Sequence, residues 1–380
     1  MMHIHNGDVV AVRARRAGIP GEHLSFRESL VTGPVVPGEQ WLALRATHHA
    51  GMANEELLRV SNDLFEQEQA LEAAAGHDEI VLWFEHDLFC LIHCVYLLQR
   101  FRTHGNLGIV WSREPLSDSS DEALTRSFTL RRPVTPAMLE AAAEVWTDYV
   151  SSDPTSLNRW LARDVHDFPF LRDGLLLHAR RFPSSRNGLG AIEQRALAQI
   201  DAGVIDFASL FTRLDSDPPR YGFGDTQVMA ELRGLASRRV PLITMIETND
   251  EPPRATFTIT PAGREVALGT VDDATLNERD LWLGGTHVTK ESMWRFDEAQ
   301  QRIIRSPSAG SGASPPPTAS ASPDCCTNRN LRRNDRNACW CTCMAPAARR
   351  SSTRNGRTSW RRSFSREGSP SSRSTTAART

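Results

Sequence analysis

The fold class follows from one stretch of sequence, IVLWF at Ile80–Phe84, which runs directly into Glu85-His86-Asp87. An unbroken apolar run of this length is typical of a strand that is buried on both faces, as in the centre of a parallel sheet. The polar residues stand where such a strand ends, and a helical pattern over residues 88–102 follows. Ligands bind at the carboxyl ends of the strands in open α/β sheets. The stretch therefore predicts a central strand with a candidate binding position at its end.

The sequence on either side of this stretch alternates in the same way. Strand patterns occur at residues 3–6, 24–26 and 107–111, and helical patterns occur at 9–17, 39–50, 54–75 and 88–102. Strands that alternate with helices predict a mostly parallel, Rossmann-like sheet. We therefore predict an α/β domain over residues 1–130, and we interpret the polar residues 112–133 as a loop or domain boundary.

A second, mainly helical domain is predicted over residues 134–304. Three helical patterns after residue 188 precede two strand patterns, Leu242–Glu247 and Ala255–Thr260. This order is typical of a winged helix, a DNA-binding variant of the helix-turn-helix. The third helix is expected to expose Thr226, Gln227, Arg233, Arg238 and Arg239. Acidic residues outnumber Lys and Arg over residues 187–300, however, whereas a DNA-binding face should be basic, so a structural or protein-binding use is favoured over nucleic acid.

The composition is that of a soluble globular protein. The 380 residues suffice for two domains, and the 40% hydrophobic content suffices for their cores. Apolar runs stay far below the roughly 18 residues of a membrane-spanning helix, and the N-terminus leads into a strand pattern and not into a secretion signal. We therefore expect a cytoplasmic protein with no membrane partner. Only Cys90 and Cys94 precede residue 306, which argues against a disulfide framework.

The C-terminal residues 305–380 differ from the rest in composition and charge. From Ser306 the chain is rich in Ser, Pro, Ala, Thr and Arg, and it holds 13 Arg against three acidic residues. The net charge is therefore +10 there and −12 over residues 1–305. Such a segment has too little apolar surface to fold, so we expect a disordered basic tail. Two interpretations stay open, a basic arm for nucleic acid and out-of-frame translation past the natural end of the gene.

Truncation after Ile304 is expected to leave the melting temperature unchanged, because the tail lacks apolar side chains with which to dock. Limited proteolysis of the full chain should cut first between Ser306 and Arg329. A loss of more than about 1 kcal/mol of stability on truncation would instead show that the tail packs on the folded part of the chain.

Polar side chains at the predicted strand ends form the candidate site. Carboxylate oxygens of Asp8, Glu85 and Asp87 are ligands of the kind that Mg²⁺ accepts, and Arg27 and Arg45 are suited to phosphate. Together they predict a site for a nucleotide or another phosphorylated small molecule, with or without a divalent metal. In the alternative interpretation Asp8 only caps a helix, Gly7 only makes a turn and Glu85 only pairs with an arginine. The predicted ligand-binding set is His3, Asn6, Gly7, Asp8, Arg27, Glu28, Glu85 and Asp87.

Other patterns of histidine and cysteine are weaker indications of a metal site. His86, Cys90, His93 and Cys94 share one helical face, where they could bind zinc, although such a face is more often plain core. His3 and His5 have the H-x-H spacing of metal hydrolases, but no further ligands stand out. No Walker loop, G-x-S-x-G elbow or G-x-G-x-x-G occurs, so the residues name no reaction.

Residues of about 1–304 resemble an uncharacterised bacterial family, domain of unknown function 1835. The resemblance implies no activity, but it implies that the natural chain ends shortly after the segment Trp294–Asp297. Similar sequences carry Asp-Gln where this chain has Cys90-Leu91, which removes polar groups from the presumed site. The segments that carry the resemblance are His3–Asp8, Ile19–Glu22, Arg27–Leu30, Gly33–Val35, Leu82–Phe89, Phe168–Leu171, Phe182–Ser184, Asn187–Leu189, Trp282–Gly285 and Trp294–Asp297.

Two functions from different classes follow. The first is a cytoplasmic protein whose α/β domain binds a small phosphorylated ligand. The second is a transcription regulator in which the winged helix binds DNA and the α/β domain senses a ligand.

Overall fold

The computed structural model describes residues 1–214, 220–248 and 254–306. Of the predicted tail, this part of the chain includes only Arg305 and Ser306, and Arg305 is the last residue of a strand. The remainder of the predicted tail lies outside the described residues.

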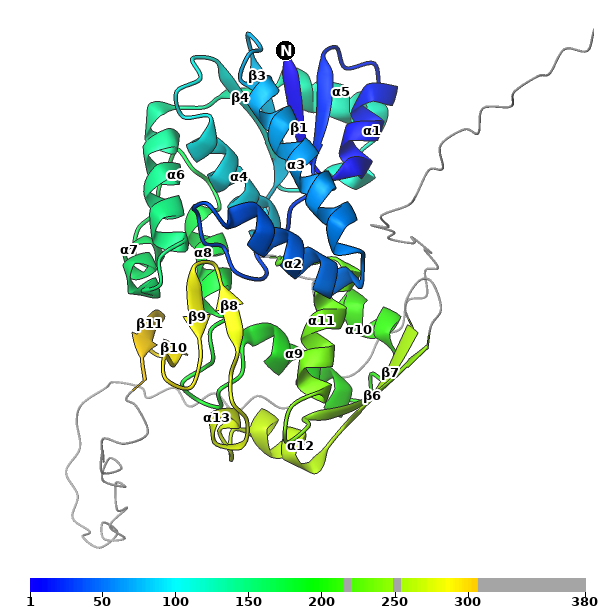
Figure 1. Cartoon of the computed structure of the whole chain (residues 1–380), viewed down its shortest axis with the longest axis vertical. Coiled ribbons are helices and arrows are strands. Elements are labelled where there is room, and N and C mark those ends of the chain that lie inside the picture. The colour runs from blue at the N-terminus through cyan, green and yellow to red at the C-terminus, as the bar shows by residue number, and fades with distance from the viewer. Residues whose placement is uncertain (215–219, 249–253, 307–380) are drawn as a thin grey trace, which may run out of the picture. The chain divides into compact units, whose positions relative to one another are not determined.

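The N-terminal half contains a five-stranded sheet (Figure 1). The strands follow the order β2-β1-β3-β4-β5, and the first four are parallel, whereas β5 runs antiparallel to β4. The predicted mostly parallel α/β sheet is therefore confirmed. The strands are β1 (Met2–Asn6), β2 (Glu22–Phe26), β3 (Ile80–Glu85), β4 (Leu107–Ser112) and β5 (Arg132–Pro133).

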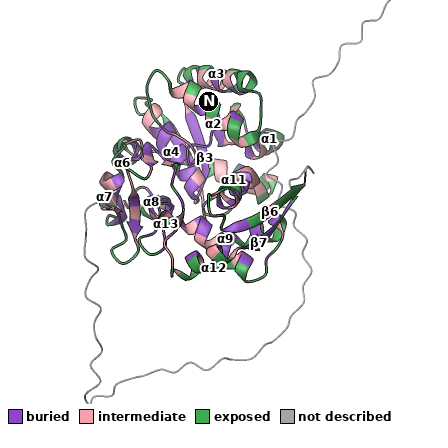
Figure 2. Ribbon diagram, turned by 60° about the horizontal axis from the view of Figure 1, so that its bottom comes forward, coloured by how far each residue is buried: buried purple, intermediate pink, exposed green. Residues whose placement is uncertain are grey.

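Helices cover both faces of this sheet, which explains the unbroken apolar run in β3. Ile80, Leu82 and Phe84 pack into the larger hydrophobic cluster, together with residues of α4. Val81 and Trp83 point to the opposite face and pack with residues of α1 and α5. All six residues of β3 are buried, and Figure 2 shows β3 and much of α4 in the buried colour. The helices around the sheet are α1 (Asp8–Arg16), α2 (Trp41–Ala53), α3 (Leu57–Ala74), α4 (Leu88–Arg100), α5 (Asp121–Thr129) and α6 (Pro136–Tyr149).

The order of the strands creates a switch point between β1 and β3. After β1 the chain passes through α1 on one face to reach β2, and after β3 it passes through α4 on the other face to reach β4. The two connections therefore leave neighbouring strands in opposite directions. Ligands of open α/β sheets bind at such a position, outside the carboxyl ends of the two strands.

The interpretation of residues 112–133 as a loop is wrong. They contain a 3₁₀ turn, η1 (Leu116–Asp118), then helix α5 and the edge strand β5. The side chain of Ser120 caps α5 by accepting a hydrogen bond from the Ala123 N–H group. Only Leu124 of this helix is buried, so its apolar pattern is too sparse to be recognised in the sequence.

The second half of the chain is helical and also contains three hairpins of short antiparallel strands. Its helical elements are η2 (Pro154–Leu157), α7 (Asn158–Leu161), α8 (Leu171–Ala179), α9 (Ala191–Asp201), α10 (Phe207–Leu214), α11 (Asp225–Ala236), α12 (Pro261–Leu268) and α13 (Asp273–Leu276). Its strands are β6 (Ile243–Thr248), β7 (Arg254–Ile259), β8 (Leu281–Leu283), β9 (Thr286–Val288), β10 (Trp294–Asp297) and β11 (Arg302–Arg305), and they pair antiparallel as β6-β7, β8-β9 and β10-β11. None of the described helices is long and apolar enough to cross a membrane.

The segment between α9 and α10 also pairs with β7. Asp206 forms an antiparallel bridge with Thr256, and the Phe257 N–H group donates to the Ile205 carbonyl at 2.9 Å. The element order in this region is thus helix, bridge, helix, helix and a two-stranded ribbon.

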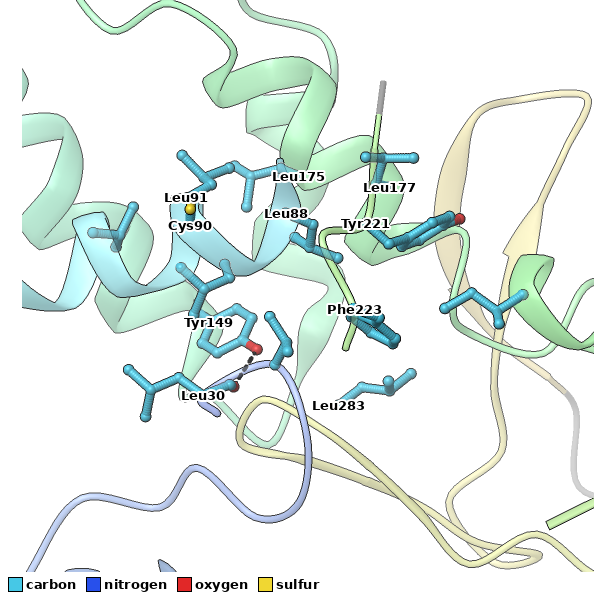
Figure 3. Packing of buried hydrophobic residues seen from close by; sticks show 14 of the residues in the cluster. Leu30, Leu88, Cys90, Leu91, Tyr149, Leu175, Leu177, Tyr221, Phe223 and Leu283 are labelled. Carbon is cyan, nitrogen blue, oxygen red and sulfur yellow. Dashed lines mark hydrogen bonds between the residues drawn. The ribbon is translucent and has the colours of Figure 1, made fainter. Parts of the chain in front are cut away.

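Residues of both predicted domains share the larger hydrophobic cluster. The Tyr149 hydroxyl donates to the Leu30 carbonyl at 2.8 Å (Figure 3). Arg181, which is 5% exposed, donates to the carbonyl of Val31. The division of the chain near residues 130–134 stays a prediction.

Candidate functional site

The carboxyl end of β1 leads through a single glycine into α1. Gly7 has φ 82°, a left-handed conformation that a side chain would strain, and its N–H group donates to the Phe26 carbonyl at the end of β2. A Cβ atom at Gly7 would meet no heavy atom within 4 Å. The glycine is therefore required by its conformation and not by crowding. Gly7 is also the N-cap of α1, and it has no side chain with which to cap the N–H groups of the first turn.

Asp8 and Arg27 pair across the ends of β1 and β2. The Arg27 guanidinium donates to both carboxylate oxygens of Asp8, with Nη2 at 2.7 Å from Oδ1 and Nε at 2.9 Å from Oδ2. Partial burial opposes ionisation of Asp8, but hydrogen bonds from Arg27 and Ser25 outweigh it and lower the pKa of the carboxyl below its usual value. The side chains are 40% and 58% exposed, so solvent reaches the pair.

Asn6 joins β1 to α4. Its amide nitrogen donates to Cys90 Sγ at 3.0 Å, and its amide oxygen lies 2.9 Å from His93 Nδ1. The Leu30 N–H group donates to His93 Nε2, so the neutral ring donates its Nδ1 proton to Asn6. Burial lowers the pKa of His93 to about 3, which keeps it neutral. These contacts favour the core interpretation of the Cys90 and His93 face over a zinc site.

The carboxyl end of β3 is covered by a segment from the second half of the chain. Asp87 caps α4 by accepting from the Cys90 N–H group at 2.6 Å. The Leu88 and Phe89 N–H groups donate to the carbonyls of Arg220 and Tyr221, both at 3.0 Å. Gly222 has φ 68°, and a Cβ there would lie 2.4 Å from Asp87 Cγ. We refer to Arg220–Gly222 as the crossing segment.

The structure does not assemble the predicted Mg²⁺ site. Over residues 1–214, 220–248 and 254–306, no three His, Cys, Asp or Glu side chains come together in a group that could hold a metal ion. Each carboxylate is engaged in a different way, because Asp8 pairs with Arg27, Asp87 caps α4, and Glu85 accepts from the Leu116 N–H group at 3.0 Å. The three therefore do not act as one ligand set.

Glu28 and Arg45 form a buried ion pair and do not face the strand ends. Arg45 is 0% exposed, and its Nη2 lies 2.6 Å from Glu28 Oε1, to which His49 also bonds. Burial opposes ionisation of Glu28, but Arg45 and His49 outweigh it and hold the pKa of the carboxyl well below its usual value. Arg45 also donates to the carbonyls of Thr32 and Pro34, so it orders the loop after β2. The prediction of Arg45 as a phosphate ligand is therefore wrong.

His3 lies in a buried aromatic cluster near the other end of β1. Because side chains alternate along a strand, His3 and His5 point to the face of α1 and α5, where they stack with His23. The Trp83 indole donates to His3 Nδ1 at 3.1 Å, and His3 Nε2 in turn donates to the Pro20 carbonyl at 3.0 Å. Burial lowers the pKa of His3 to about 4. The cluster is thus a set of neutral rings in the core, and His3 is not part of the strand-end site.

The third helix of the predicted winged helix does not present the expected face. Gln227 is 8% exposed, accepts from the Gly224 N–H group and donates toward Ser29 of the α/β half. Arg233 is paired with Glu247, and Arg238 is largely buried against Glu193. The prediction that this face is exposed is therefore wrong for Gln227, because α11 packs against the α/β half. It is also wrong for Arg238, which follows the end of α11 and pairs with Glu193 and Asp273.

Three of the eight predicted ligand-binding residues form one solvent-accessible group, namely Gly7, Asp8 and Arg27. Asn6 and Asp87 both bond to Cys90 of α4 and are not part of this group. Glu85 bonds to Leu116, Glu28 to Arg45 and His3 to Trp83, so these three residues are separate from the group and from one another. The crossing segment was missed by sequence reasoning. The only sequence feature that marks the crossing segment is the pair of glycines on either side of Phe223. Such a pair is equally typical of a turn that leads into a helix.

Searches for related proteins gave no family to compare with this site. No protein-family model matches the chain. No curated protein matches it either.

Proposed function

We propose that the α/β half binds a phosphorylated small molecule, such as a nucleotide, at the carboxyl ends of β1 and β2. The observation that carries this proposal is the solvent-accessible Asp8–Arg27 pair beside the uncapped first turn of α1, next to the switch point of the sheet. A guanidinium fork binds phosphate as readily as carboxylate. The carboxylate of Asp8 occupies the position that a phosphate oxygen of the ligand would take.

The N-terminus of α1 supplies the second half of this site. Its N–H groups carry partial positive charge, and a helix N-terminus after a glycine is a common anion-binding element of α/β folds. Gly7 leaves space above it, since no atom lies within 4 Å of a Cβ built there. When the ligand binds, Asp8 must release Arg27, so the two side chains have opposite effects on affinity.

We expect Arg27→Met to weaken ADP binding by about 10-fold or more, because a charge-assisted hydrogen bond contributes about 1.5–3 kcal/mol. Asp8→Asn should instead tighten binding, because it removes the carboxylate that competes with phosphate for Arg27. Isothermal titration with ADP and with inorganic pyrophosphate, each with and without Mg²⁺, measures both effects.

Arg264→Met is the matched control, since Arg264 is 52% exposed and is also paired with a carboxylate, that of Asp201, but lies on α12 in the second half of the chain. It should leave the affinity unchanged. Equal weakening by the Arg27 and Arg264 variants, or weakening by Asp8→Asn, would refute the site.

The regulator alternative receives less support. The proposed winged helix has the right element order, including the bridge between Asp206 and Thr256, but its third helix is packed against the α/β half. We therefore propose that this segment serves as a structural partner of the α/β half.

Membership in the family named domain of unknown function 1835 is likewise proposed, for residues of about 1–304. Several of the segments that carry the resemblance contact one another in the fold. Ser185 donates to the Phe296 carbonyl, and the Phe296 N–H group donates to the Pro183 carbonyl. Arg295 donates to the Ser184 carbonyl, and the Val35 N–H group donates to the Gly284 carbonyl, both at 3.0 Å. These motifs therefore have a structural use, which supports the proposal without adding an activity.

A further inference from the structure

A groove with an apolar lining and an acidic rim lies between the segment that leads into α2 and the middle of α3. Its volume is about 360 Å³. Apolar side chains of Trp41, Leu42 and Phe65 line it, and the carboxylates of Glu39, Glu68 and Glu72 stand among them. We call this the acidic groove.

The acidic groove carries uncompensated negative charge. Glu68 is paired with Arg100 at 2.6 Å. Over residues 1–214, 220–248 and 254–306, Glu39 and Glu72 have no ion-pair partner. The surroundings reinforce this charge, because residues 54–79 contain eight Asp or Glu and a single Arg.

The same part of the surface exposes large apolar side chains. Phe65 is 55% exposed in the acidic groove, and Leu58, two turns earlier on α3, is 65% exposed. Exposed apolar side chains beside a polar rim are typical of surfaces that bind another molecule. Trp41 stacks on Tyr96 at a ring distance of 6.2 Å, which fixes one wall of the groove to the core.

We propose that the acidic groove binds an arginine-rich segment of a partner protein. A guanidinium group can stack on the aromatic rings of Trp41 or Phe65 and donate in parallel to a carboxylate such as Glu72. A second copy of this face is disfavoured as the occupant, because two acidic surfaces would repel each other. The complementarity of charge therefore selects a basic partner.

Octa-arginine labelled with fluorescein is the probe, titrated with the full-length protein and followed by fluorescence anisotropy. The double variant Glu39→Gln, Glu72→Gln should weaken binding by about 10-fold at low salt, because it removes both uncompensated carboxylates. The double variant Glu56→Gln, Glu66→Gln is the matched control. It changes the net charge equally, at the N-cap of α3 and within α3, but neither residue lines the groove, so its effect should stay within about 2-fold.

A second pair of variants tests the apolar part of the site. Phe65→Ala should weaken binding by about 5-fold, because it removes an aromatic wall, whereas Leu58→Ala should leave it unchanged. Circular dichroism confirms that each variant is folded. Equal weakening by the two double variants would show only non-specific attraction and would overturn the proposal. Failure of the full-length protein to bind octa-arginine would also overturn it, including the case in which the chain's own arginine-rich residues 306–380 fill the groove.

Discussion

Glu193→Gln is expected to lower the free energy of unfolding by about 3–5 kcal/mol. Glu193 lies at the centre of a buried charge cluster. Arg279 donates to both of its carboxylate oxygens, at 2.8 and 2.9 Å, and Arg238 also bonds to it. Both guanidinium groups lie within 3.3 Å of Asp273, which is 0% exposed. Loss of the Glu193 charge leaves two buried cations with one anion between them.

The comparison is Glu278→Gln, which breaks an ion pair with Lys290 whose side chains are 76% and 68% exposed. That change should cost less than about 0.5 kcal/mol, because solvent screens exposed pairs. Urea unfolding followed by circular dichroism measures both variants. Loss of less than 1 kcal/mol in the Glu193 variant would mean that Asp273 alone compensates both arginines.

Acidification from pH 7 to 5 is expected to destabilise the protein by on the order of 5 kcal/mol, before most carboxylates titrate. Burial lowers the pKa of His48, His93 and His178 to about 3, whereas the pKa of an unfolded histidine is near 6.5. The unfolded chain therefore binds more protons than the native protein below pH 6.5. Stability falls as pH drops through this window, and each of the three histidines contributes up to about 1.4 kcal/mol per pH unit.

His178→Phe separates the histidine contribution from other effects of acid. His178 is 0% exposed, and neither of its ring nitrogens has a hydrogen-bond partner in the described chain. Phenylalanine should therefore fit without loss of a bond, and it should reduce the slope of stability against pH between 6 and 5 by about 1.4 kcal/mol per unit. A series of urea titrations at different pH values tests this. An unchanged slope in the variant, or wild-type stability that is independent of pH, would contradict the expectation.

The sheet could be predicted because the apolar patterns that define its strands lie within short, continuous stretches of sequence. Ile80–Phe84 has an unbroken apolar run since both faces of β3 are covered, and the alternation of strands and helices sets a parallel order. Helix α5 escaped prediction because only Leu124 is buried in it. The strand-end position of Asp8 and Arg27 also followed from local pattern, and the pair does meet there.

The rest of the site depended on contacts that a linear pattern does not encode. Glu28 was predicted as a strand-end ligand because it follows β2. In the structure it is buried in an ion pair with Arg45, which lies on the next helix. The position of His3 could have been predicted from the sequence. Because side chains alternate along a strand, His3 and His5 lie on one face of the sheet and Asn6 lies on the other. The partners of Asp87 and α4 lie in the crossing segment, far along the chain, and sequence reasoning had no means of placing it.

The crossing segment has a consequence for the order of events during synthesis. The whole five-stranded sheet, through β5 at Arg132–Pro133, is translated well before Arg220–Gly222. Until those residues leave the ribosome, the N–H groups of Leu88 and Phe89 lack the carbonyls that they bond to in the native fold. The start of α4 in the nascent α/β half therefore stays uncovered during this interval. Incompletely packed chains of this kind are the ones that chaperones bind. A ribosome that is stalled before residue 220 would carry the α/β half in this uncovered form.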